Sequence, residues 1–149
     1  MTGSIDPTRE AMAAFRDLPL DQPIAMLNLL RFRDRAAYAD DVDAAVPRDV
    51  SGAEAYAAYG RAAAAPFARA GGRQVWLGAP RLTVIGPATE AWDLAFVAEY
   101  PSGEAFLGML RDDEYRAAVV HRQAAVADSR LIRCDARRAG PAFGAESEG

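Results

Sequence analysis

The stretch that decides the fold is Pro23–Arg33, PIAMLNLLRFR, an apolar segment with an asparagine at its centre and two arginines at its end. Its composition predicts a strand over Ile24–Phe32, in which alternate side chains point to opposite faces. Burying an amide without hydrogen-bond partners costs about 1–3 kcal/mol. Asn28 therefore needs either a structural partner or a ligand. On this pattern one face carries Met26, Asn28, Leu30 and Phe32, and the other carries Leu27, Leu29, Arg31 and Arg33.

The rest of the chain reads as alternating helices and strands around this segment. A short helix opened by Asp6-Pro7-Thr8 precedes it, and a helix from Ser51, with Glu54 in a capping box, follows it. The elements expected after that are strands at Gln74–Gly78, Arg81–Ile85 and Ala91–Tyr100, helices at Glu104–Leu110 and Glu114–Ala127, and a strand at Ser129–Cys134. This order predicts an α+β, ferredoxin-like βαββαβ antiparallel sheet with its helices on one face. Its other face would be bare and apolar, which predicts a homodimer.

A chain of 149 residues fits one domain. We expect an N-terminal helical extension over 1–22, the α+β domain over 23–136 and a disordered tail over 137–149. Residues 34–50 hold five aspartates and no sustained period, and so long a connection is typical of a mobile or functional segment. We expect these residues to cover the mouth of a pocket.

Composition narrows the function classes. The formal charge is −4 and the basic residues, all arginine, are scattered, which argues against a nucleic-acid partner. The single cysteine, Cys134, excludes an intramolecular disulfide and a multi-cysteine metal site. No run of apolar residues is long enough to span a membrane and the first residues do not resemble a signal peptide, so a cytoplasmic location is expected. No GxSxG, P-loop, GxGxxG or HExxH motif is present, and no cofactor is predicted.

Several motifs in order carry a family resemblance: MLNLLRF, SGAEAYAAYG, WDLAFVAEYPSGEAFLGML, DDEY and DSRLI. Over Pro23–Cys134 the chain resembles the dimeric α+β barrel proteins, and within them an uncharacterised branch, domain of unknown function thirteen-thirty. The resemblance implies the ferredoxin-like fold and the dimer but no activity. Relatives that share only the fold include cofactor-independent monooxygenases, polyketide cyclases, lactone isomerases and haem enzymes.

The candidate catalytic residues are His121, Asn28 and Tyr59. An imidazole exchanges protons near neutral pH, and His121 is the only one in the chain. It is also typical of a partly exposed helix residue, or of a haem ligand. The Asn28 amide and the Tyr59 hydroxyl would polarise a carbonyl, or else bond the backbone and pack on the sheet.

The candidate substrate-binding residues are arginines and aromatic side chains. An arginine can clamp a carboxylate, although one near a strand end often pairs with a neighbouring acid. Aromatic side chains suit an apolar pocket and equally suit a core. The set is Tyr38, Tyr56, Arg31, Trp92 and Arg122.

These residues predict a pocket for an apolar or aromatic ligand. One interpretation is a cofactor-independent cyclase, isomerase or dehydratase acting on an aromatic or polyketide-like substrate, with His121 as the proton carrier. The alternative is a non-catalytic ligand-binding or stress-related barrel, with a haem-binding barrel or a cofactor-independent monooxygenase as further possibilities.

Overall fold

Four strands form one antiparallel sheet in the computed structural model, which describes residues 3–144. The strands are β1 (Ile24–Phe32), β2 (Arg73–Gly78), β3 (Leu94–Tyr100) and β4 (Val126–Asp135), in the spatial order β2-β3-β1-β4. The predicted strand β1 lies between β3 and β4, where Asn28 is opposite Phe96 on one side and Leu131 on the other. This topology confirms the ferredoxin-like α+β prediction.

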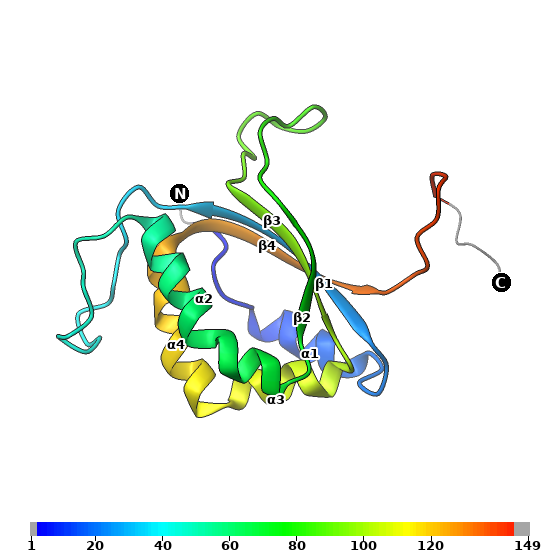
Figure 1. Ribbon diagram of the computed structural model, residues 1–149, viewed down its shortest axis with the longest axis horizontal. Helices are drawn as coiled ribbons and strands as arrows, with labels where there is room; N and C mark the ends of the chain where they lie inside the picture. Colours follow the sequence, from blue (N-terminus) through cyan, green and yellow to red (C-terminus); the bar gives the residue numbers. More distant parts are fainter. Residues whose placement is uncertain (1–2, 145–149) are drawn as a thin grey trace.

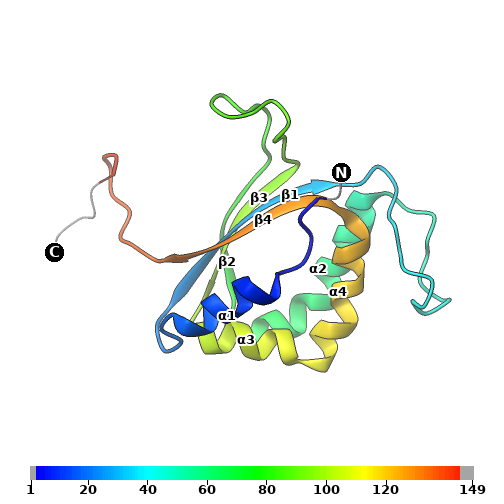
Figure 2. The same ribbon diagram turned by 180° about the vertical axis from the view of Figure 1, so that it is seen from behind.

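Four helices lie on the same side of this sheet (Figures 1 and 2). They are α1 (Arg9–Asp17), α2 (Gly52–Arg69), α3 (Gly103–Arg111) and α4 (Asp113–Ala125). The capping box of α2 is present, since Ser51 and Glu54 each accept a hydrogen bond from the other's backbone N–H. The cap of α1 is Thr8, whose hydroxyl accepts from the Ala11 N–H, and not Asp6. Pro66 is buried inside α2, which continues to Arg69.

The predicted strand Arg81–Ile85 is wrong. Residues 79–93 form a loop that projects beyond the sheet (Figure 1), and the segment lacks a neighbouring strand to pair with. Its apolar side chains are exposed as a result: 81% for Leu82, 83% for Val84 and 94% for Ile85. Strand β3 begins at Leu94, later than expected. Just before it, the Asp93 carboxylate accepts the Phe32 N–H at 2.8 Å, so a side chain takes the place of a backbone carbonyl as the acceptor there.

Two groups of buried residues lie between the sheet and the helices. The larger joins Ile24 and Met26 of β1 to Phe15 of α1 and Phe106 of α3, whose rings are 5.3 Å apart. The smaller contains Leu30, Ala55, Ala125 and Val126. The N-terminal extension is therefore packed into the same core as the rest of the fold.

The connection between β1 and α2, residues 34–50, lies against α4. The Ala37 N–H bonds the Ala124 carbonyl at 2.9 Å, and the Arg33 N–H bonds the Ala125 carbonyl at 2.8 Å. At the other end of the chain, residues 136–144 form no helix or strand and run away from the sheet (Figure 1). The remainder of the predicted tail lies outside the described residues. Within residues 3–144, no helix is both long and apolar enough to cross a membrane.

Candidate ligand-binding cavity

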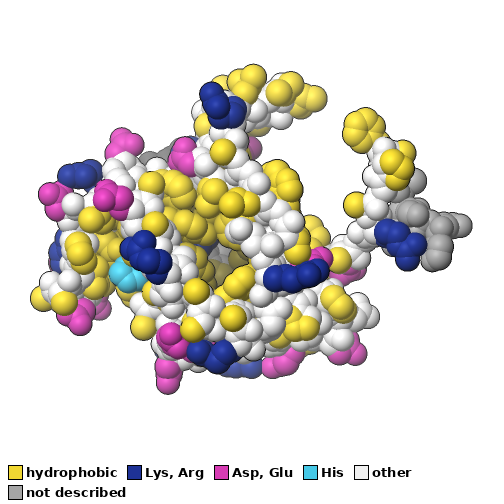
Figure 3. Space-filling view, in the orientation of Figure 1, with side chains coloured by type: hydrophobic (Ala, Val, Ile, Leu, Met, Phe, Trp, Pro, Cys, Tyr) yellow, Lys and Arg dark blue, Asp and Glu magenta, His cyan; other side chains and the backbone are white. Residues whose placement is uncertain are grey.

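A cavity of about 1010 Å³ lies between the sheet and its covering helices. It is visible as the hollow at the centre of Figure 3, surrounded by hydrophobic side chains. Its walls come from all four strands, from all four helices and from the N-terminal residues 4–8. Apolar cavities of this size are typical of binding sites for small organic molecules, since such sites have volumes of about 300–1,000 Å³. The apolar lining includes Met26, Leu94, Phe96, Ala63, Phe67, Phe106 and Val119.

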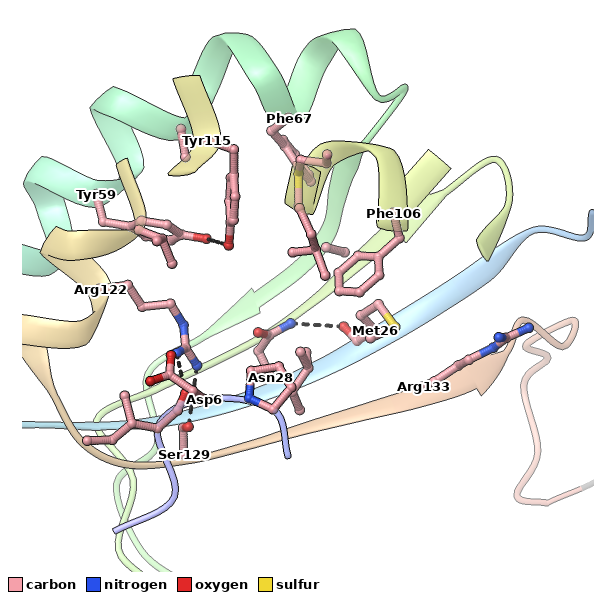
Figure 4. Close-up of a pocket in the computed structure, with 18 of the residues that line it drawn as sticks. Asp6, Met26, Asn28, Tyr59, Phe67, Phe106, Tyr115, Arg122, Ser129 and Arg133 are labelled. Atoms are coloured by element: carbon pink, nitrogen blue, oxygen red, sulfur yellow. Dashed lines mark hydrogen bonds between the residues drawn. The ribbon is translucent and has the colours of Figure 1, made fainter. Parts of the chain in front are cut away.

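Asn28 points into this cavity from the centre of the sheet (Figure 4). Its amide nitrogen donates to the Met26 carbonyl of the same strand at 3.1 Å. The structural partner expected for the Asn28 amide is therefore the backbone carbonyl of Met26, two residues earlier in the same strand. Because this bond uses only the nitrogen, the amide oxygen remains available to a molecule in the cavity.

A pair of tyrosine hydroxyls faces the cavity from two helices. The hydroxyl of Tyr59, on α2, lies 2.9 Å from that of Tyr115, on α4 (Figure 4). Tyr56, one helical turn before Tyr59, lines the same wall and stacks against Phe32 with ring centroids 5.1 Å apart. Burial raises the pKa of both Tyr56 and Tyr59 well above the usual 10.0, so both hydroxyls are neutral hydrogen-bonding groups.

Arg122 enters the cavity from α4 and holds the N-terminal residues in place (Figure 4). Its guanidinium donates to the Ile5 carbonyl at 2.5 Å and to the Ser129 hydroxyl at 3.3 Å. The Ser129 hydroxyl in turn donates to the Ser4 carbonyl at 2.7 Å. Residues 4–8, called the N-terminal arm below, therefore form one wall of the cavity and are anchored to α4 and β4.

His121 and Tyr38 are paired with each other outside this cavity. The Tyr38 hydroxyl lies 2.7 Å from Nδ1 of His121, and neither side chain lines the cavity. Because Val119 and Arg122 face the interior, His121 points away from it on α4. Burial, assisted by the nearby charge of Arg61, lowers the pKa of His121, while burial raises that of Tyr38. Residues 34–50, expected to form a lid, contribute no residue to the cavity wall within the described chain.

Arg31 and Trp92 also lie away from the cavity. Arg31 is on the opposite face of β1, where it pairs with Asp128 at 4.0 Å and donates to the Thr89 carbonyl at 3.3 Å. Trp92 precedes β3 and is covered by the Arg130 guanidinium, 5.2 Å from its ring centroid. Of the eight predicted site residues, the cavity therefore brings together Asn28, Tyr56, Tyr59 and Arg122.

Among the polar residues of the cavity that were not singled out from the sequence are Tyr115, Ser129 and Asp6. A partner for Tyr59 was not detectable, because the two tyrosines are 56 positions apart. Asp6 resembled a helix cap, but its carboxylate accepts from the Gln123 side chain at 3.2 Å. It is the only carboxylate among the described residues that line the cavity. Over residues 3–144, no group of three or more His, Cys, Asp or Glu side chains is placed to hold a metal ion.

The fold and the cavity define a ferredoxin-like α+β protein with a small-molecule-sized interior site. The family described as Domain of unknown function (DUF1330) matches residues 44–134, more than half of the chain, and the chain belongs to that family. The resemblance found in the sequence is thereby confirmed. The comparison with curated proteins gives no match.

Solved structures extend this result. A protein of unknown function from Rhodopseudomonas palustris is 54% identical, with a TM-score of 0.83, over 93% of this chain and 100% of that one. The structure of its methylated form gives a TM-score of 0.86 at the same identity, over 94% and 99% of the two chains. A cofactor-independent oxygenase from Streptomyces nogalater is 17% identical, with a TM-score of 0.50, over 81% of this chain and 99% of that one. That likeness extends to the fold alone.

Proposed function

We propose that the protein binds a small, largely apolar or aromatic molecule in the cavity between its sheet and helices. The observation that carries this proposal is the combination of a volume of about 1010 Å³ with apolar walls and a few inward-facing polar groups. The Asn28 amide and the Tyr59–Tyr115 pair would orient a carbonyl or hydroxyl group of the ligand.

Two helical glycines provide a matched test of this proposal. A Cβ atom added at Gly60 or at Gly108 would meet no atom of another element within 4 Å, so both positions have open space where a side chain begins. Gly60, on α2, lines the cavity, whereas Gly108, on α3, does not. We expect Gly60→Leu to weaken binding of the neutral fluorophore anthracene-2-carboxamide about fivefold or more by occupying the site. Gly108→Leu should leave the affinity unchanged. Equal effects of the two substitutions would contradict binding in the cavity.

As an enzyme, the protein would perform cofactor-independent proton transfer, of the cyclisation, isomerisation or dehydration type. The fold it shares with a protein described as a cofactor-independent oxygenase supports chemistry without a cofactor on this scaffold. The polar groups of the cavity support proton transfer in particular: the Tyr59 and Tyr115 hydroxyls would polarise a carbonyl, and the Asp6 carboxylate would accept the proton. This assigns to Asp6 the role expected for His121, which faces away from the cavity.

A pair of substitutions tests the assignment of the proton acceptor. Asp6→Asn keeps the size of the side chain and its bond to Gln123 but removes its basicity, and should lower turnover of a substrate about 100-fold or more. Asp17→Asn, at the exposed end of α1, is the control and should leave turnover unchanged. Full turnover in Asp6→Asn would eliminate Asp6 as the acceptor while leaving ligand binding intact.

The protein is further proposed to form a homodimer through the face of the sheet that the helices leave bare. Across that face, Leu27 is opposite both Val97 and Ile132, and Val97 is opposite Trp76. In the single chain Trp76 is 55% exposed and Ile132 47% exposed. A monomer rarely exposes a row of apolar side chains that extends across all four strands of a sheet. A second copy of the chain would bury this row.

A further inference from the structure

Arg122 makes its hydrogen bonds to uncharged groups. Both acceptors, the Ile5 carbonyl and the Ser129 hydroxyl, carry no formal charge. A guanidinium has five N–H donors, and these two bonds leave donors unused. A half-buried cation is stabilised best by an opposite charge, because burial removes part of its hydration. Arg122 is therefore a positively charged group at the cavity. A negatively charged ligand would accept its remaining hydrogen bonds and balance its charge.

Within residues 3–144, three other arginines line the cavity. Arg116, on α4, is exposed to solvent, unlike the half-buried Arg122. Arg130 forms ion pairs with Glu90 at 3.0 Å and Asp128 at 2.9 Å. Arg133 lies over the Phe15 ring, 4.6 Å from its centroid, and donates to the carbonyls of Phe15 and Pro19 at the end of α1. In Figure 4 Arg133 lies apart from the other labelled polar residues, whereas Arg122 extends toward Asp6 and Ser129. Asp6, the one carboxylate on the wall, is bonded to Gln123, and no ion pair links it to Arg122 within the described residues.

The hydroxyls of Tyr59 and Tyr115 offer further hydrogen-bond donors on the wall of the same cavity. In the Tyr59–Tyr115 pair one hydroxyl donates to the other, so the second hydroxyl keeps a proton for the ligand. Tyr56, Tyr59 and Arg122 all line the same cavity. A cation beside neutral O–H donors, on an otherwise apolar wall, is suited to an oxyanion attached to an apolar body.

We propose that the ligand of this cavity is an organic oxyanion, with its negative group bound by the Arg122 guanidinium and its apolar body held between β1, β3 and the aromatic side chains of α2 and α3. This inference rests on the proposed function and specifies its ligand class. The apolar body lies against Met26, Phe67 and Phe106, and the available volume of about 1010 Å³ accommodates a tricyclic ring system. The charged group lies at the end of the cavity that the N-terminal arm closes.

Two fluorescent probes of equal shape test the charge preference. Anthracene-2-carboxylate is ionised at pH 7.5, and anthracene-2-carboxamide is its neutral counterpart. We expect the unaltered protein to bind the carboxylate about tenfold or more tightly than the carboxamide, since a charge-assisted hydrogen bond is roughly twice as strong as a neutral one. Equal affinities would overturn the anionic ligand and leave the apolar cavity site standing. Binding of neither probe at millimolar concentration would overturn both proposals.

Substitutions at Arg122 locate the preference. Arg122→Gln should abolish the preference for the carboxylate, and Arg122→Lys should restore part of it. Arg61→Gln removes an exposed charge from α2 that does not line the cavity, and should retain the full preference. Circular dichroism would confirm that each variant is folded. A tenfold preference that persists in folded Arg122→Gln would overturn Arg122 as the anion site.

Discussion

The hydroxyl of Tyr59 lies 2.9 Å from the hydroxyl of Tyr115, and this contact joins α2 to α4 at the wall of the cavity. Tyr115 is a buried residue, 8% exposed, so its hydroxyl depends on this partner inside the protein. The two rings meet edge to face with centroids 6.1 Å apart. The pair therefore links the two helices and also presents polar groups to a molecule bound in the cavity.

Tyr59→Phe removes one half of this pair. We expect it to lower the free energy of unfolding by about 1 kcal/mol, because the buried Tyr115 hydroxyl loses its partner. Urea denaturation followed by circular dichroism measures this change. The matched control is Tyr56→Phe, on the same wall, whose hydroxyl is in no hydrogen bond within residues 3–144 and whose removal should be close to neutral. An equal loss in both variants would indicate that the hydroxyl pair contributes nothing specific.

Alkaline pH should destabilise the folded protein through its buried tyrosines. Burial raises the pKa of Tyr56, Tyr59 and Tyr100 above the unfolded value of 10.0. The stability that these groups contribute is complete below pH 10 and is lost as pH rises further, because the unfolded chain releases their protons first. Between pH 9 and pH 11 the free energy of unfolding should fall by about 1 kcal/mol or more. Urea titrations at several pH values test this, and a flat profile would show that these hydroxyls ionise freely when folded.

Leu27→Asp tests the proposed homodimer. Leu27 lies at the centre of the bare sheet face, opposite Val97 and Ile132, so a carboxylate there would be buried between two copies without a partner. Analytical ultracentrifugation should give a dimer for the unaltered protein at micromolar concentration and a folded monomer for the variant. Ala57→Asp, at an exposed position of α2, is the control that should remain dimeric. A stable monomer of the unaltered protein would end the proposal.

His121→Gln tests whether His121, the only histidine in the chain, acts at the ligand or has a structural role outside the cavity. Its bond to Tyr38 attaches residues 34–50 to α4, so the variant should increase amide hydrogen exchange in that segment. Binding of anthracene-2-carboxamide should stay within about twofold of the unaltered protein, since His121 does not line the cavity. Weakened binding with unchanged exchange would instead support the role first expected for His121 at the ligand.

The fold was predictable because its signals are local. The alternation in Ile24–Phe32, the Ser51–Glu54 capping box and Ser102 at the start of α3 each depend on residues only a few positions apart. The failure at Arg81–Ile85 has a different origin. Its composition is that of a strand, but a strand also needs a neighbour, and β2 already forms the edge of the sheet without it.

The cavity was only partly predictable, because its polar groups meet through long-range packing. Asn28, Tyr56 and Tyr59 could be placed by periodicity on the faces that meet. His121 and Arg122 are adjacent in sequence, and their roles were decided by the rotation of α4 about its axis. The alanines on several sides of that helix left the rotation open. Tyr115 and Ala118 are buried in the structure, and their positions direct Arg122 inward and His121 outward.

The family match begins at residue 44, yet much of the cavity wall lies before it. The N-terminal arm, α1 and the inward face of β1 supply Asp6, Phe15, Met26 and Asn28, all upstream of the matched residues. The matched portion thus supplies three helices and most of the sheet, whereas the N-terminal arm, α1 and the central strand β1 come from the residues before it. Two members alike over residues 44–134 can consequently differ in what they bind, and choosing a substrate by family membership alone would overlook about a third of the cavity wall.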